Sequence, residues 1–380
     1  MSKQILRGRA LVDGEFRDDQ ILICEGGRFT FVGPQREEVP DHVFETGCLV
    51  PGFLDIHVHG AHGADVMDGT SAGLETIAQA LASYGVTGFL ATTLTGDLDH
   101  LEHVLQTCVV FSKNAAVGAR LLGVHLEGPW INARYKGAQN EAHVVRPLLR
   151  DAKRLVEAGQ GLLKLVTLAP EHPEAADVIA YLHEQGVCVS VGHSDATFAD
   201  VTEAMEHGLG HVTHCCNAMR GLHHREPGVV GAAMYHEALT AELIADGVHV
   251  HPAVMNILYK VKRREHLVLV SDGMRAVGMQ DGAYDLGGLQ VQLVNGEARL
   301  EDGTLAGSTL TLDRAVRNMV TLGRVPLADA VIMASSTPAA VLGLTDRKGQ
   351  LASGYDADFV WLDDDHQVRA TYIAGVRQSR

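Results

Sequence analysis

Short runs rich in Val, Leu and Ile alternate with amphipathic runs along the middle of the chain. The apolar runs predict strands, and apolar residues at helical spacing between most of them predict helices. Several strands are almost continuously apolar, which is typical of parallel strands buried on both faces. Eight such units predict an α/β protein with a (β/α)8 TIM-type barrel. The candidate strands are residues 53–58, 86–93, 121–127, 162–170, 187–193, 211–214, 239–246 and 266–272.

Both ends of the chain have a different texture. Residues 1–50 contain short strand-like runs separated by glycine and other turn residues, and the segment from 344 to 380 looks the same. We therefore expect a small β-sandwich domain formed by both chain termini, residues 1–50 plus 344–380, and a barrel over residues 51–343. Within the barrel, residues 274–304 predict an inserted loop with a hairpin.

Composition narrows the classes of partner. The chain has 380 residues, 46% hydrophobic and 21% charged, and its net charge of −16 argues against nucleic acid as a partner. A small phosphorylated ligand remains compatible, because one local arginine can bind it. The N-terminal sequence has no continuous apolar run, so we expect neither a signal peptide nor a membrane span. The 6 cysteines form no CxxC pair, which favours free thiols and a cytoplasmic protein.

Residues that often bind metals stand at the predicted strand ends. The first strand ends in His57 and His59, which share one face because they are two residues apart. Catalytic residues of a (β/α)8 barrel lie at the carboxyl ends of its strands. The third, fifth, sixth and eighth strands end in Glu127, His193, His214 and Asp272.

Each of these residues also has a structural explanation. A lone histidine after a strand can be a hydrogen-bonded loop residue, and Glu127 or Asp272 could cap the following helix. Their joint occurrence on five strands favours a metal site. On the fifth strand, Val189 and Val191 share a face with His193, which would aim the histidine at the mouth if that face points inward.

Histidines with a carboxylate suit Zn or Fe(II) better than Mg or Ca, which prefer oxygen ligands. Glu127, His193 and His214 can form one site with a position left for water. His57 and His59 can form an adjacent site, with Glu127 able to bridge the two. The sequence leaves open whether one or two divalent ions bind per subunit.

These motifs resemble the amidohydrolase superfamily and, more closely, its N-acetylglucosamine-6-phosphate deacetylases. The resemblance covers essentially the whole chain and rests on PGFLDIHVHG, HLEGPW, KGAQN, VGHSDAT, THCCNAM, REPG, IADGVHV, LVSDG and LAGS, in the order of the family. It implies metal-dependent hydrolysis of N-acetylglucosamine 6-phosphate to glucosamine 6-phosphate and acetate, with a metal-bound hydroxide as nucleophile.

The resemblance also implies roles for individual residues. Asp272 matches the general base and acid, and His249 matches a histidine that contacts the acetyl group. Arg225 matches an arginine that reaches the phosphate in the neighbouring active site, which implies a homodimer. The metal ligands it implies are Glu127, His193 and His214 for the principal site and His57 and His59 for the second. Further implied substrate contacts are Ala138, Gln139, Asn217, Ala218, Leu305, Ala306 and Gly307.

The chain departs from the family pattern in places. Gln139 stands where some members have histidine, and Gly273 follows Asp272 where alanine is more frequent. Two alternatives stay open: a deacetylase of a related substrate such as N-acetylgalactosamine 6-phosphate, and an inactive amidohydrolase-like binding protein. We expect His125 to be a packed, hydrogen-bonded support of the site and assign no role to Glu171.

Overall fold

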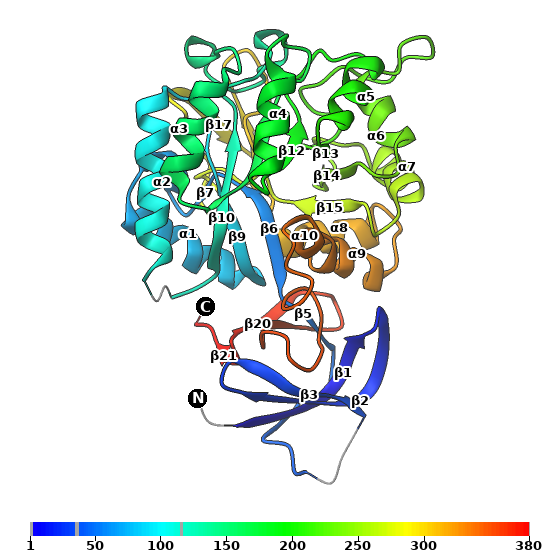
Figure 1. The fold of residues 1–380 in the computed structure, drawn as a ribbon. Helices are drawn as coiled ribbons and strands as arrows, with labels where there is room; N and C mark the ends of the chain where they lie inside the picture. The colour runs from blue at the N-terminus through cyan, green and yellow to red at the C-terminus, as the bar shows by residue number, and fades with distance from the viewer. Residues whose placement is uncertain (1–2, 35–37, 115–116, 380) are drawn as a thin grey trace.

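A computed structural model gives the fold of residues 3–34, 38–114 and 117–379. In Figure 1 a barrel surrounded by helices stands above a smaller β unit, in which the blue N-terminal and red C-terminal strands lie together. The parts of the predicted terminal domain at residues 1–2, 35–37 and 380 lie outside the described residues.

An 8-stranded parallel sheet forms the barrel wall. The backbone N–H of Asp272 donates to the carbonyl of His57 at 2.9 Å, and a bridge joins Val58 to Gly273, so the last strand end meets the first. The predicted (β/α)8 fold is confirmed. The strands are, in sheet order, β6 (Phe53–Val58), β9 (Val86–Thr92), β10 (Arg120–Glu127), β11 (Leu163–Leu168), β12 (Cys188–Val191), β13 (Leu209–Val212), β14 (Thr240–Ile244) and β15 (Leu267–Val270).

Amphipathic helices cover the outside of the barrel, and their apolar faces join the barrel strands in one buried cluster. Thr70 and Thr197 begin α1 and α5 by accepting backbone N–H groups of the first turn. None of the helices in the described part of the chain is long and apolar enough to span a membrane. The helices are α1 (Ser71–Ser83), α2 (Leu98–Ser112), α3 (Leu149–Gly159), α4 (Ala175–Glu184), α5 (Phe198–Glu206), α6 (Gly228–Tyr235), α7 (Pro252–Lys262), α8 (Leu312–Thr321), α9 (Leu327–Met333) and α10 (Ser336–Val341).

Both chain ends build a second sheet, as expected. β5 pairs antiparallel with β19, which joins N-terminal to C-terminal strands, and only Gly52 separates β5 from the first barrel strand. Phe29, Phe359 and Tyr372 pack in its own core. We retain 1–50 plus 344–380 as the proposed limits of this domain. Its strands are β1 (Gln4–Val12), β2 (Glu15–Glu25), β3 (Arg28–Pro34), β4 (His42–Val43), β5 (Cys48–Pro51), β19 (Phe359–Leu362), β20 (Val368–Ile373) and β21 (Val376–Arg377).

The insertion after β15 is a 3-stranded antiparallel sheet, one strand more than the predicted hairpin: β16 (Gly282–Leu286), β17 (Leu289–Val294) and β18 (Glu297–Arg299). Leu286 and Leu305, at its edges, line the cavity at the barrel mouth. The insertion therefore forms one wall of the candidate site. Short elements complete the mouth: β7 (Gly60–Ala61), β8 (Ala64–Asp65), η1 (Val66–Asp68), η2 (Ala133–Tyr135) and η3 (Glu141–His143).

Candidate metal centre

The candidate site residues lie where the barrel strands pass into loops. His193, His214 and Asp272 have positive φ angles of 48°, 28° and 48°. Side chains other than glycine rarely adopt this region, and each such residue costs about 1–3 kcal/mol unless its surroundings fix it. Three such residues at the carboxyl ends of barrel strands mark this end as a candidate functional site.

His193 reaches the mouth through a turn, not through strand alternation. β12 ends at Val191, and Ser190 points into the barrel, where its hydroxyl lies 2.6 Å from Thr213 Oγ1. Val189 and Val191 therefore face outward, because neighbouring strand residues alternate. The condition that the face of these valines points into the barrel is therefore not met. The left-handed backbone at His193 redirects its side chain.

Glu127 lies at the centre of the first group of candidate ligands. Its Oε1 is 3.1 Å from His193 Nε2 and 3.0 Å from His214 Nε2. The two ring nitrogens are 3.1 Å apart. Glu127 extends from the end of β10, while the histidines follow β12 and β13, so three strands bring these atoms together.

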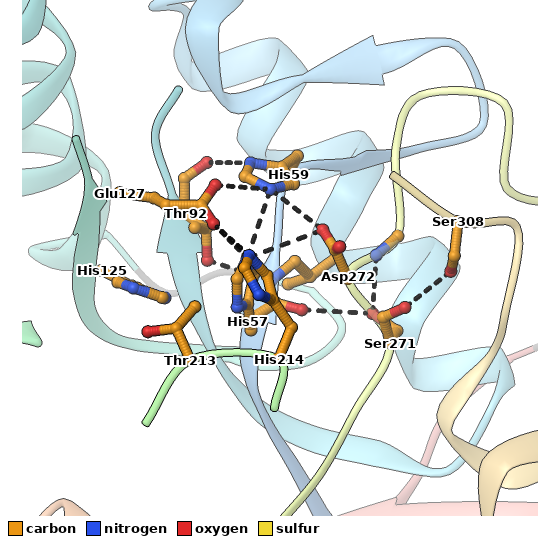
Figure 2. A network of polar contacts seen from close by, with 12 residues as sticks. His57, His59, Thr92, His125, Glu127, Thr213, His214, Ser271, Asp272 and Ser308 are labelled. Carbon is orange, nitrogen blue, oxygen red and sulfur yellow. Dashed lines mark hydrogen bonds and ion pairs between the residues drawn. The ribbon is translucent and has the colours of Figure 1, made fainter. Parts of the chain in front are cut away.

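His57 and His59 form a second group beside it, and Figure 2 shows both rings turned towards Glu127 and Asp272. Their Nε2 atoms are 3.3 Å apart. Asp272 Oδ1 lies 3.1 Å from His59 Nε2, and Glu127 Oε2 lies 3.4 Å from the same atom. Glu127 is therefore placed between the two groups, as the bridging hypothesis requires.

The tautomers of these rings fit a bound cation. His193 Nδ1 lies 2.8 Å from the carbonyl of Tyr135, and His59 Nδ1 lies 3.1 Å from the carbonyl of Thr92. A carbonyl only accepts, so each Nδ1 carries a proton, and each ring in its neutral form presents a lone pair at Nε2. Ring nitrogens with free lone pairs, placed beside one carboxylate, can bind a divalent metal through nitrogen and oxygen ligands.

Glu242, on β14, is a supporting residue that the sequence reasoning missed. Its Oε2 lies 2.8 Å from His57 Nδ1 and accepts the backbone N–H of His214 at 3.0 Å. Burial raises the pKa of this carboxyl, but His57 and His211 together outweigh burial and hold the pKa well below its usual range. A signal was present, since Glu242 is an acidic residue in the middle of the predicted strand 239–246.

The neighbouring histidines favour the carboxylate form of Asp272. Burial raises its pKa, but the neighbouring His57 and the hydrogen bond with His59 lower it below the ordinary value. For His59, burial lowers the pKa, while Asp272 and Glu127 raise it to about 9. A carboxylate held in this form, at the edge of the histidine cluster, is able to accept a proton.

The side-chain amide of Gln139 forms hydrogen bonds through both its nitrogen and its oxygen. Its nitrogen donates to Glu127 Oε2 at 2.7 Å, and its oxygen accepts the backbone N–H of Thr95 at 2.7 Å. The side chain is buried, with 4% exposure. In this structure Gln139 therefore orients the carboxylate that connects the two ligand groups, while its predicted role as a sugar contact stays a prediction.

A cavity of about 290 Å³ opens over the centre. Most of the predicted site residues line it, whereas His57 lies fully buried behind His59, and Ala306 is also fully buried. Arg134, which the sequence reasoning did not select, lines the mouth as well. The predicted residues on the cavity wall are His59, Glu127, Ala138, Gln139, His193, His214, Asn217, Ala218, His249, Asp272, Leu305 and Gly307.

Arg225 is not among the residues that line this cavity. It is exposed, and its Nη1 lies 2.8 Å from the ring of the adjacent His224. The predicted role places it in the active site of a neighbouring subunit, so its distance from its own cavity does not contradict that role, which stays a prediction.

Two further residues support the loops and strands below the site. His125 packs edge-on against His57, with ring centroids 4.6 Å apart, and its Nε2 lies 2.7 Å from Thr167 Oγ1, as expected of a packed support. Glu171 accepts from the Asn132 side chain at 2.9 Å and from Ser194 Oγ at 2.7 Å. It therefore connects the loops that follow β10, β11 and β12.

Comparison with known proteins gives the class to which this centre belongs. Residues 48–377 match the Amidohydrolase family, and the chain belongs to that family. It is 37% identical to the N-acetylglucosamine-6-phosphate deacetylase of Lysinibacillus sphaericus, with 98% of this chain and 96% of the relative covered. It is 40% identical to the N-acetylgalactosamine-6-phosphate deacetylase of Escherichia coli O157:H7, with 98% of both chains covered.

The solved structures agree. A mutant N-acetyl-D-glucosamine-6-phosphate deacetylase from Mycobacterium smegmatis, in complex with N-acetyl-D-glucosamine-6-phosphate, matches with a TM-score of 0.95 and 33% identity over 99% of both chains. The resemblance that the motifs indicated is confirmed: within the family, the chain is similar to deacetylases of phosphorylated amino sugars.

Replacing Gln139 with leucine tests whether its hydrogen bond to Glu127 supports metal binding. Gln139→Leu removes the donor to Oε2, and we expect affinity for a divalent metal to fall by roughly 10–100-fold, the usual cost of losing a group that orients a ligand. Competition with a chromophoric chelator measures it. Gln106→Leu is a matched control, because Gln106 donates to Glu102 at 3.0 Å on the exposed face of α2. Equal affinities for Gln139→Leu and wild type would contradict the assignment.

Proposed function

We propose that this protein hydrolyses N-acetylglucosamine 6-phosphate to glucosamine 6-phosphate and acetate. The observation that carries the proposal is the convergence of Glu127, His193, His214 and Asp272 on one cavity. Near full-length similarity to deacetylases of that name supports the choice of substrate.

In this proposal Glu127, His193 and His214 hold the principal divalent ion, and His57 with His59 can hold a second. Zn and Fe(II) suit a donor set of imidazole nitrogens and a carboxylate. When bound, the ion supplies a Lewis acid for the acetyl carbonyl and lowers the pKa of a coordinated water. One or two ions per subunit are compatible with the two groups of ligands.

Asp272 carries the proton transfers. As a carboxylate on the cavity wall it takes a proton from the attacking water and then donates it to the leaving nitrogen, which departs as the amine. The remaining contacts would position the sugar phosphate. We propose for this role Ala138, Gln139, Asn217, Ala218, His249, Leu305, Ala306 and Gly307.

Asp272→Asn isolates the proton-transfer role. The amide keeps the size of the side chain but cannot accept the proton, so we expect kcat to fall by about 10²–10⁴-fold with the metal content unchanged. Turnover by acetate release and metal content by mass spectrometry are measured on the same sample. Near-normal turnover would remove Asp272 from the mechanism.

The galacto epimer is the second candidate substrate. The Escherichia coli relative named for N-acetylgalactosamine 6-phosphate is as similar over the same length as those named for the gluco epimer. We expect the metal-reconstituted protein to release acetate faster from N-acetylglucosamine 6-phosphate. Faster release from the galacto epimer would transfer the assignment to that sugar. No release from either, with metal bound, would favour the inactive binding protein.

We also propose a homodimer in which Arg225 of one subunit reaches the phosphate bound by the other. Arg225 is exposed and lies outside its own cavity. Leu222 on the same loop and Tyr235 at the end of α6 are 60% and 75% exposed, so apolar surface is available near it. A guanidinium binds phosphate through paired hydrogen bonds.

Arg225→Ala should raise KM for the phosphorylated sugar far more than for unphosphorylated N-acetylglucosamine, because only the former offers the phosphate. Arg150→Ala is the control, since Arg150 is also exposed and forms an ion pair with its neighbour Asp151 at 3.3 Å. An equal rise in KM for both sugars would reject the phosphate contact.

We propose a cytoplasmic location. All of its cysteines are free thiols, at positions 24, 48, 108, 188, 215 and 216. Free thiols without a disulfide framework are typical of proteins in a reducing compartment.

A further inference from the structure

Asp246 and His249 form a hydrogen-bonded pair on the loop between β14 and α7. Asp246 Oδ2 lies 2.6 Å from His249 Nδ1. The other carboxylate oxygen, Oδ1, accepts the backbone N–H groups of Val248 and His249, each at 2.8 Å. The side chains of His249 and Asp246 are only 7% and 10% exposed. Both oxygens of Asp246 are thus committed, and the carboxylate has a single orientation.

This pairing decides which part of the His249 ring meets a bound molecule. The carboxylate accepts the proton of Nδ1, and His249 lines the cavity, so Nε2 is the ring nitrogen left for a ligand. The charged groups that act on the ring are Asp246, Asp272 and Arg299. Burial lowers the pKa of His249, but the hydrogen bond and charge of Asp246, with the charge of Asp272, outweigh burial and the opposing charge of Arg299. The pKa is therefore raised.

We propose that Asp246 is a positioning residue that locks the His249 ring so that a positively charged Nε2–H is presented to an oxygen atom of the substrate. The proposal rests on the hydrolysis of a phosphorylated N-acetyl sugar proposed above. The oxygen belongs either to the acetyl group, where negative charge develops during attack, or to the phosphate, and both accept from a cationic donor.

Asp246→Asn separates this role from simple support of the loop. The two backbone N–H groups keep the asparagine oxygen at the Oδ1 position, as in a side-chain cap. The amide NH2 then faces His249 Nδ1 and must donate to it, because an NH2 group cannot accept. Nδ1 becomes an acceptor, the ring becomes neutral, and the loop contacts remain.

The first experiment is a pH titration of the histidine ring signals by NMR on the metal-loaded protein. The His249 signal is assigned by its loss in His249→Gln. We expect the pKa of His249 to lie above the ordinary value of about 6.5 in the wild type and below it in Asp246→Asn. Asp246→Ser, whose side chain is too short to reach the ring, should shift it in the same direction. An unchanged titration in both variants would overturn the proposal.

This titration needs no substrate, so it tests the pair even if the proposed hydrolysis is wrong. Turnover of the wild type, measured in parallel, tests the hydrolysis by itself. The two failures are therefore distinguishable.

The second experiment measures kinetics against pH. The charged ring is present below the pKa of His249 and is lost as pH rises through it, so the alkaline limb of kcat/KM should move to lower pH in Asp246→Asn. At pH values above both pKa values the loss should approach about 10-fold for each unit by which the variant lowers the pKa of His249. If Asp246 acts through His249, adding Asp246→Asn to His249→Gln should cost almost nothing more. Losses that multiply in the double variant would overturn the proposal.

The kinetic constants also identify the oxygen. A loss confined to kcat, for phosphorylated and unphosphorylated sugar alike, assigns Nε2–H to the acetyl oxygen. A rise in KM for the phosphorylated sugar alone assigns it to the phosphate. Either pattern supports the positioning role.

Discussion

The carboxylate of Glu127 is the group on which the arrangement of the barrel mouth depends. It lies within 3.1 Å of His193 and 3.0 Å of His214, and within 3.5 Å of His57 on the other side. A buried negative charge is costly without compensation, so these rings and the Gln139 amide are also what makes its burial possible. Burial raises the pKa of Glu127, but the histidines outweigh burial and hold it well below its usual range.

Most of the histidine rings at the barrel mouth are oriented by hydrogen bonds at Nδ1, the ring nitrogen that faces away from the centre or the cavity. Four histidines of the barrel mouth meet an acceptor at Nδ1: a backbone carbonyl for His59 and His193, Glu242 for His57, and Asp246 for His249. In every case the opposite nitrogen is turned to the centre or the cavity. A carboxylate partner also favours the charged ring, which at His249 gives a cationic donor, whereas a metal bound at His57 would release the second proton of that ring. The same construction thus presents lone pairs at the metal site and, in our proposal, a cationic donor at the substrate.

The sequence predicted the barrel because eight apolar runs alternate with amphipathic ones, and it predicted the terminal β unit because both ends share short strands and turns. Candidate ligands could be found because they stand at strand ends. Strand alternation did not explain how the His193 side chain reaches the mouth. The backbone of His193 is left-handed, which interrupts the alternation, and no sequence pattern indicates this conformation. Glu242 and Asp246 were missed because they act on the far side of a ring, and that contact depends on three-dimensional packing.

Glu127 and its histidines form the proposed metal site, and equilibrium binding of Zn(II) to metal-depleted protein tests that site most directly. We expect the wild type to bind at least one ion tightly. Glu127→Gln should lower the affinity for that ion by more than the roughly 10–100-fold cost of losing a supporting residue, because it removes the charge of a ligand. Equal affinity in the two proteins, or no tight binding by the wild type, would contradict the account.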